Sequence, residues 1–282
     1  MADIHCRINP DAHINELLPH WTTVFGVPES VFTPVWEAMG PGRRILAEAR
    51  VDGQIVSTVA VYLFEVSLGG FRSVQMPGVA NVSTVPEFRG KGLSSELLRL
   101  AKEEMSGGFS LLYTGVPEHY AKVGYFLIPD LVVEIRPAGD PITPEPAPDR
   151  NRVQAIHSEG LATHPGAAVR DSVWWEKAVW FRTQSRLVWA DIDAYLFADK
   201  SETGLTVIEA FGEAPALARL VNGAASWASA NGMTEFRSRV RLPEGVESTA
   251  TEHVGGAMVL PLRLDAGDST RLGQGFLGID HF

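Results

Sequence analysis

Residues 89–94 form a short basic turn whose composition suits the binding of an anion. They read Arg-Gly-Lys-Gly-Leu-Ser, so two glycines alternate with an arginine and a lysine. Glycine allows the backbone to approach a ligand closely, and successive backbone N–H groups in such a turn can point at one anion. A helix that begins just after the turn adds the favourable field of its N-terminus. The sequence therefore predicts a phosphate or diphosphate site.

The flanking residues predict the elements that hold this turn. Val79–Val85 is apolar and β-branched, which favours a strand closed by Pro86. After the turn, apolar residues recur every four positions, as on one helix face: Leu93, Leu97, Ala101 and Met105. The order is strand, turn, helix, but the spacing is neither that of a Walker loop (GxxxxGK[ST]) nor that of the dinucleotide fingerprint (GxGxxG).

Two motifs resemble the GNAT acetyltransferase superfamily. The turn fits its Arg/Gln-x-x-Gly-x-Gly/Ala pattern as Arg89-Gly90-Lys91-Gly92-Leu93-Ser94, with Ser94 departing from the usual last residue. His119–Tyr125 resembles its Tyr-x-x-x-Gly-Phe/Tyr helix and follows a strand candidate at Leu111–Tyr113. The resemblance covers about residues 40–136. More narrowly, the pair is similar to the enhanced-intracellular-survival type of aminoglycoside acetyltransferase.

The resemblance implies an acetyl-CoA site and a catalytic acid. In the family, the strands carrying the two motifs splay apart and hold pantetheine between them. The implied CoA-binding residues are Ser83, Thr84, Val85, Arg89, Gly90, Lys91, Gly92, Leu93, Ser94, Gly115 and Val116. Tyr120 occupies the family's general-acid position. Because a phenol has a pKa of about 10, it stays protonated at neutral pH and can donate to the departing thiolate.

The general base is open among three carboxylates. Glu65 ends an early strand that would point toward the acceptor side, and Glu118 adjoins the tyrosine motif. The third candidate is the terminal carboxylate of Phe282, because the survival-protein type is thought to use a C-terminal carboxylate and this chain also ends in Phe.

Element patterns predict an α/β (α+β) fold with two GNAT-like domains. Each would be a mixed, mostly antiparallel sheet flanked by helices. The first half is predicted to contain helices at Asn9–Gly26 and Pro34–Met39, strands at Arg44–Val51 and Gln54–Phe64 joined by the Asp52-Gly53 hairpin, and a strand from Arg72 that Pro77-Gly78 breaks before Val79. The second half is predicted to contain helices at Val173–Phe181 and Pro215–Ala230 and strands at Arg186–Ala190, Ala194–Ala198, Leu205–Phe211, Glu235–Leu242 and Ala257–Leu264.

These patterns divide the chain into a catalytic domain, residues 1–136, and a degenerate GNAT-like domain, residues 151–282. Five prolines crowd the linker between them, residues 137–150. In the second half, the turn before the helix reads Gly212-Glu213-Ala214-Pro215, which lacks paired glycines and carries a carboxylate where phosphates would sit. We therefore expect no acetyl-CoA there. The survival-protein family adds a third, sterol-carrier-like domain, for which this chain is too short.

Composition narrows the partners. The net charge of −10 disfavours nucleic acid and suits a cationic amine substrate. No apolar run of 18 residues occurs, so no membrane span is expected. The single cysteine, Cys6, favours a reducing cytoplasm, and the scattered histidines imply no metal. Oligomeric state stays open. Four tryptophans lie near the start of the second half: Trp174, Trp175, Trp180 and Trp189. They could form a wall of the acceptor pocket, but packing in the core or between the domains is the preferred interpretation.

Four functions compete on this basis. The first is N-acetyl transfer from acetyl-CoA to a primary amine of a small molecule, such as an aminoglycoside-like antibiotic. The others are acetylation of a protein amine, non-catalytic regulation by acyl-CoA binding, and transfer of a longer acyl chain. The turn together with Tyr120 favours an enzyme, and a covering second half favours a small acceptor.

Overall fold

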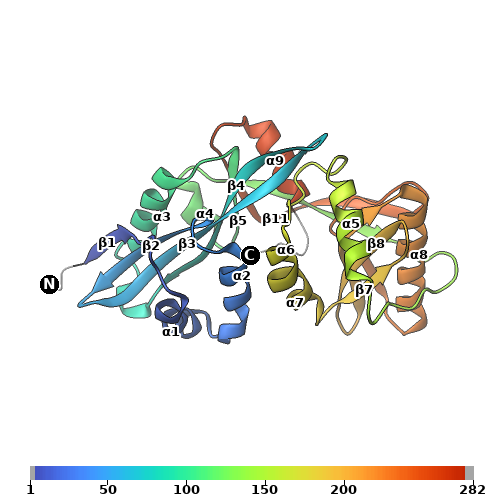
Figure 1. The fold of residues 1–282 in the computed structure, drawn as a ribbon, viewed down its shortest axis with the longest axis horizontal. Helices are drawn as coiled ribbons and strands as arrows, with labels where there is room; N and C mark the ends of the chain where they lie inside the picture. Colours follow the sequence, from blue (N-terminus) through green and yellow to red (C-terminus); the bar gives the residue numbers. More distant parts are fainter. Residues whose placement is uncertain (1–3, 277–282) are drawn as a thin grey trace.

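A computed structural model describes residues 4–276 of the chain. Its eleven described strands form one mixed sheet in the order β1-β2-β3-β4-β5-β11-β6-β10-β9-β8-β7. Figure 1 shows helices on both faces of this sheet and two lobes lying side by side, the N-terminal half at the left and the second half at the right. The predicted mixed, mostly antiparallel α/β architecture is confirmed.

The first half builds the left lobe. Its elements are β1 (His5–Ile8), α1 (Ile14–Phe25), α2 (Thr33–Met39), β2 (Arg44–Val51), β3 (Gln54–Gly69), β4 (Arg72–Thr84), α3 (Leu93–Glu104), β5 (Phe109–Tyr113), α4 (Pro117–Ala121) and β6 (Phe126–Ile135). Neighbouring strands pair antiparallel from β1 to β4, and the predicted hairpin at Asp52-Gly53 is present, with both residues at positive φ.

The second half builds the right lobe and returns to the first. Its elements are α5 (Arg150–Gly160), α6 (Ser172–Trp174), a π-helical turn (Trp175–Val179), α7 (Trp180–Thr183), β7 (Leu187–Ala190), β8 (Ala194–Lys200), β9 (Gly204–Gly212), α8 (Ala214–Ala230), β10 (Glu235–Ser238), β11 (Ser248–Pro261) and α9 (Ala266–Gly275). Asp149 caps α5 by accepting from the N–H groups of Asn151 and Arg152. Sequence patterns did not predict α5 or α9.

Strand β11 joins the two halves. It pairs antiparallel with β5 on one side and with β6 on the other, so a strand from the end of the chain lies inside the sheet of the first half. Strand β6 in turn pairs with β10 of the second half. The strands of the two lobes therefore belong to one continuous sheet, which β6 and β11 connect.

The sheet divides the core of the first half into two layers. On one face, α3 and α4 bury Leu97, Leu98 and Tyr120. On the other face, α1 and α2 bury Trp21 and Trp36, in a core that extends into the second half. All four tryptophans of the predicted cluster are at most 4% exposed, which supports packing as their role: Trp174, Trp175, Trp180 and Trp189.

Several element predictions were wrong in their bounds, among them β11, which begins at Ser248 rather than Ala257, and β3, which ends at Gly69 rather than Phe64. Two further differences concern β4 and β10. Strand β4 runs unbroken from Arg72 to Thr84 through Pro77-Gly78, and its irregularity lies at Asn81, which has φ +49° next to a register shift against β3. Strand β10 stops at Ser238 rather than Leu242. Pairing with neighbouring strands explains both differences. Strand β4 continues through Pro77-Gly78 because β3 lies beside it over most of its length. Strand β10 ends early because β9 pairs with it only as far as Val207.

Within residues 4–276, no helix combines the length and the apolar character needed to cross a bilayer. In the same part of the chain, no three His, Cys, Asp or Glu side chains gather as metal ligands would.

Candidate active site

The Arg89–Ser94 turn lies at the start of α3 with open space before it. Gly90 and Gly92 have φ values of +75° and +79°, and a Cβ added to either would meet no atom within 4 Å. Gly92 is the N-cap of α3, and no side chain caps the helix there. The first N–H groups of a helix have no partner within it, so this end can receive an anion. The turn predicted from the sequence therefore leads into an uncapped helix N-terminus, with free space at both of its glycines.

The end of β4 supports this turn. Ser57 Oγ donates to the carbonyl of Ser83 and lies 2.8 Å from Thr84 Oγ1, while the Val85 N–H donates to Val56. Arg89 Nε donates to the Thr84 carbonyl at 3.0 Å, which ties the turn back to the strand. The predicted residues Ser83, Thr84 and Val85 thus lie directly beside the cradle, at the strand end that leads into it.

A buried polar chain holds α1 beneath the same strand end. His20 Nε2 lies 2.8 Å from Ser83 Oγ, which lies 2.8 Å from Thr58 Oγ1. Trp21 Nε1 also donates to Thr58 Oγ1, at 2.9 Å. Burial lowers the pKa of His20 to about 4. The Ser83 hydroxyl is therefore committed to packing α1 on the sheet, and sequence reasoning missed His20.

Strands β4 and β5 splay apart next to the cradle. They are parallel and share a single bridge, between Gly78 and Leu111. Near the parting, Asn81 Nδ2 donates to the hydroxyl of Tyr62 at 3.1 Å. Burial raises the pKa of Tyr62, so its phenol stays protonated. Asn81 is a polar residue within the largely apolar run 79–85, and this signal could have identified it as a special position in the sequence.

Tyr120 lies on α4, just past the end of β5. Its side chain is 8% exposed, and its ring contacts His119 and Tyr125 at centroid distances of 5.0 and 6.4 Å. Burial raises its pKa, partly offset by the Thr114 side chain. The loop before it contains the exposed residues Gly115 and Val116, and the Val116 N–H donates to Thr114 Oγ1. The tyrosine and the cradle residues lie on elements at either side of the β4–β5 gap.

Tyr125 has a structural role. Its hydroxyl lies 2.6 Å from Ser110 Oγ, which donates to the Pro77 carbonyl at 2.7 Å. This chain connects β5 to β4 beside their bridge. Burial raises the pKa of Tyr125.

Two of the three base candidates, Glu65 and Glu118, lie in the part of the chain that the structure describes. Glu65 is exposed on β3, opposite Gln75, and accepts a hydrogen bond from Ser73 Oγ. It lies three residues beyond Tyr62, toward the tip of the β3–β4 ribbon. Glu118 is exposed on α4. The carboxylate of Phe282 lies outside the described residues.

Comparison with known proteins agrees with this geometry. Residues 6–128 match the sequence model of the acetyltransferase (GNAT) domain. This part of the chain is a GNAT acetyltransferase domain. No curated protein matches the chain.

Solved structures share the fold over nearly the whole chain. A probable N-acyltransferase from Enterococcus faecalis is 15% identical with a TM-score of 0.69, covering 93% of this chain and 73% of its own. A GCN5-related N-acetyltransferase from Kribbella flavida is 20% identical with a TM-score of 0.69, covering 92% and 72%. Eis1 from Mycobacterium abscessus is 14% identical with a TM-score of 0.57, covering 93% and 73%. At these identities the likeness concerns the fold.

Proposed function

We propose that the protein is an N-acetyltransferase that uses acetyl-CoA to acetylate a primary amine of a small molecule. The observation that carries the proposal is the unobstructed turn at Gly90 and Gly92, directly beside the gap between β4 and β5. Open space at the uncapped N-terminus of α3 leaves room for a diphosphate. Acetyl-CoA supplies the acetyl group when bound, and the residues that would hold it are the predicted ones at 83–85 and 89–94, together with Gly115 and Val116.

In this proposal Tyr120 is the general acid. Its hydroxyl is protonated at neutral pH, because burial raises its pKa above the ordinary value. A buried phenol beside the gap can therefore donate its proton to the thiolate that leaves when the amine has attacked. Direct attack of the amine on the thioester carbonyl requires no enzyme nucleophile.

A small acceptor is favoured by the way in which the second half covers the acceptor face of β3. Trp174 packs on Phe64 with ring centroids 5.2 Å apart, and Lys177 Nζ pairs with Glu37 of α2 at 2.9 Å. A bridge also links Val66 to Ala168. These contacts place α6 and the π-helical turn against α2 and β3 and restrict access to the acceptor side. The net charge of −10 supports a cationic amine.

The roles of the segments follow as part of the same proposal. Residues 1–136 carry the catalytic groups, 137–150 form the linker, and 151–282 form a half that does not bind acetyl-CoA. The base is proposed to be a carboxylate, either Glu65 or the terminal group of Phe282. Both the cytoplasmic location and a function without nucleic acid or membrane partners rest on the sequence arguments.

The test is a thiol-release assay with acetyl-CoA and a panel of amines that includes aminoglycosides, polyamines and lysine peptides. We expect turnover with a small-molecule amine. Turnover confined to lysine peptides would favour a protein acceptor, and faster turnover with longer acyl-CoA would change the donor. Acetyl-CoA binding should stabilise the folded chain by about 2.7 kcal/mol at a hundredfold excess over the dissociation constant. Such binding without turnover of any amine would favour a regulator instead.

A further inference from the structure

A cavity of about 470 Å³ opens in the second half where two parallel strands part. Strands β9 and β10 pair from Gly204–Val207 with Glu235–Ser238, after which β9 continues to Gly212 paired with β8 but no longer with β10. The cavity is lined by β9 at Glu209–Phe211 and by the chain after β10 at Arg239–Arg241. The α5–α6 connection and the end of α9 close its other sides.

This position corresponds to the gap beside the cradle in the first half. In both halves a strand is followed by a helix and then by a strand parallel to the first: β4, α3 and β5, and β9, α8 and β10. In both, the parallel strands share a short pairing and then diverge. The second half has therefore kept the gap between its strands, although its helix begins with a different turn.

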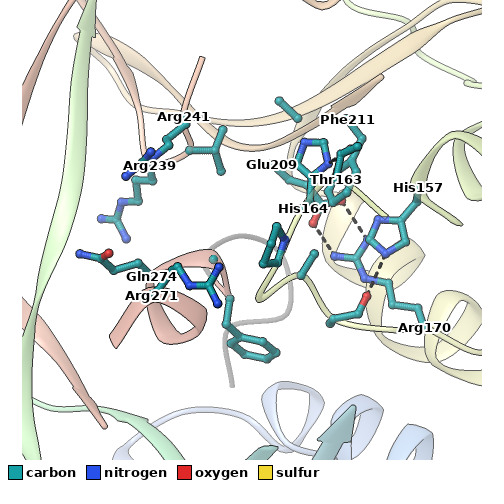
Figure 2. Close-up of a pocket in the computed structure, with 17 residues that line it drawn as sticks. His157, Thr163, His164, Arg170, Glu209, Phe211, Arg239, Arg241, Arg271 and Gln274 are labelled. Carbon is teal, nitrogen blue, oxygen red and sulfur yellow. Dashed lines mark hydrogen bonds and ion pairs between the residues drawn. The ribbon is translucent and has the colours of Figure 1, made fainter. Parts of the chain in front are cut away.

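One side of the cavity carries exposed positive charge. Arg239 and Arg241 are exposed and form no ion pair with any described residue. Arg271 of α9 pairs with Asp268 at 3.1 Å, and Gln274 lies one turn further along the same helix. Figure 2 shows these four side chains together at one side of the cavity. The chain has ten more acidic than basic residues, so this local concentration of arginine stands out and favours an anionic ligand.

The other side is a fixed network with no spare charge. Arg170 and Glu209 form a bidentate pair, with Nη1 to Oε1 at 2.9 Å, and their side chains are 1% and 4% exposed. Tyr195 also donates to Glu209 Oε1 at 2.7 Å. Glu209, the one carboxylate lining the cavity among the described residues, is thus neutralised, and it does not offset Arg239 and Arg241.

Aromatic rings cover the same side. The Phe211 ring lies 4.5 Å from the rings of both His157 and His164, between centroids. His157 is held by the Ala168 carbonyl, at 2.9 Å from Nε2. Figure 2 shows His164 and Phe211 across the cavity from the arginines. A ligand with an anionic end and a flat apolar body would meet guanidinium groups at one end and rings at the other.

We infer that this cavity is a second ligand site, which binds a small organic anion through Arg239 and Arg241. Guanidinium forks match phosphate and carboxylate groups geometrically, and the volume lies within the range of ligand pockets. Phe211 and His164 contact the apolar body of the ligand. The inference is independent of acetyl transfer, because none of the cavity residues belongs to the cradle or to α4.

The probe is phenyl phosphate, titrated calorimetrically into the full chain, with inorganic phosphate as the comparison. The double variant Arg239→Gln/Arg241→Gln should weaken phenyl phosphate at least tenfold, as expected for losing charge-assisted hydrogen bonds. The matched control is Arg237→Gln, on the same segment but outside the cavity and paired with Glu235, and it should change affinity less than twofold. Inorganic phosphate should bind more weakly than phenyl phosphate.

Two results overturn the inference. One is equal affinity of the double variant and the wild type, with the melting temperature of each showing that both are folded. The other is no saturable binding of phenyl phosphate at millimolar concentration. Equal affinity for the two phosphates would remove the role given to the rings.

A second arm separates this site from the cradle. Phenyl phosphate affinity should be the same with and without excess CoA and should survive Gly92→Asp. If CoA displaces the probe and Gly92→Asp abolishes its binding, the probe reports the cradle and the second site is refuted. If CoA itself fails to bind, the acetyltransferase proposal fails while the result at Arg239 and Arg241 still stands.

Discussion

Helices α3 and α8 occupy equivalent places in the two halves. The turn before α3 has open space around its glycines, whereas the turn before α8 is packed against Asp193 and Ala194. A Cβ on Gly92 would meet nothing within 4 Å, whereas a Cβ on Gly212 would lie 2.2 Å from the Asp193 carbonyl oxygen and 2.4 Å from Ala194 Cα. The Glu213 N–H also donates to Asp193, at 2.9 Å. In the second half, the strand partner fills the space that a diphosphate would need.

This difference shows how one strand-turn-helix unit can form both with and without open space at the start of its helix. The Asp191–Ala194 turn before β8 packs onto Gly212, and Pro at the start of α8 removes one of the N–H groups that an anion would bind. Helix formation does not depend on the site, because α8 buries Leu217, Leu220 and Val221 against β8 and β9. The ligand-binding turn is thus separable from the fold.

The largest expected effect tests Tyr120, the proposed general acid of the first half. Tyr120→Phe removes one hydroxyl and little volume, so kcat should fall by about 10²–10⁴, the range for a positioned general acid. The Michaelis constant for acetyl-CoA should change little. Steady-state kinetics from pH 6 to pH 9 would show whether the basic limb, which reports loss of the amine proton, persists.

Tyr125→Phe is the matched control. Its hydroxyl is used between Ser110 and β4, so the variant should lose about 1 kcal/mol of unfolding free energy and keep most of kcat. If Tyr120→Phe turns over like the wild type, the acid is another group. If Tyr125→Phe loses as much kcat as Tyr120→Phe, neither effect is specific to acid catalysis.

The second prediction compares the two glycines directly. Gly212→Ala should lower the free energy of unfolding by about 3 kcal/mol or more, since backbone atoms must move and the residue has φ +134°. Gly92→Ala should cost only about 1–2 kcal/mol, from positive φ alone. Urea unfolding of both variants measures the difference. Equal losses of stability would mean that the turn of α3 is as closely packed as that of α8.

Local patterns were enough to predict most elements and the cradle. The apolar spacing from Leu93 to Ala101 identified α3, and the bounds of β2 at Arg44 and Val51 were correct. These features depend on neighbours in sequence. Helix α9 was missed because its ten residues include three glycines, and glycine weakens a helix. For α5, the cap at Asp149 was an available signal, but it stands at the end of a proline-rich stretch.

Long-range pairing could not be predicted in the same way. The sequence of β11 does not predict that this strand lies between β5 and β6, because the partners of a strand depend on the assembled sheet. The same holds for the network of His157, Arg170, Tyr195 and Glu209. Its members come from α5, the following loop, β8 and β9, and no motif connects them.

The third prediction changes the charge of each of the two turns. Gly92→Asp should raise the dissociation constant for CoA by about tenfold or more, because a carboxylate would face the diphosphate across a few ångströms. Glu213→Ala removes a carboxylate from the equivalent turn and should leave CoA affinity unchanged. Calorimetric titration of CoA measures both. A gain in affinity for Glu213→Ala would show that the second half binds CoA and that its turn is not closed.

The smallest expected effect concerns pH and the support beneath the first cradle. Burial lowers the pKa of His20 to about 4 in the folded chain, below its ordinary value near 6.5, so the unfolded chain binds the proton more readily. This contribution to stability is complete above the unfolded pKa and is lost as pH falls toward the folded one.

Between pH 7 and pH 5, the wild type should therefore lose on the order of 1 kcal/mol more than His20→Gln, whose amide can still reach Ser83 Oγ but does not titrate. Urea unfolding at the two pH values gives the comparison, and His13→Gln, an exposed position at the start of the same helix, should behave like the wild type. If His20→Gln loses as much stability as the wild type, then protonation of His20 does not oppose folding, and the pH dependence has another source.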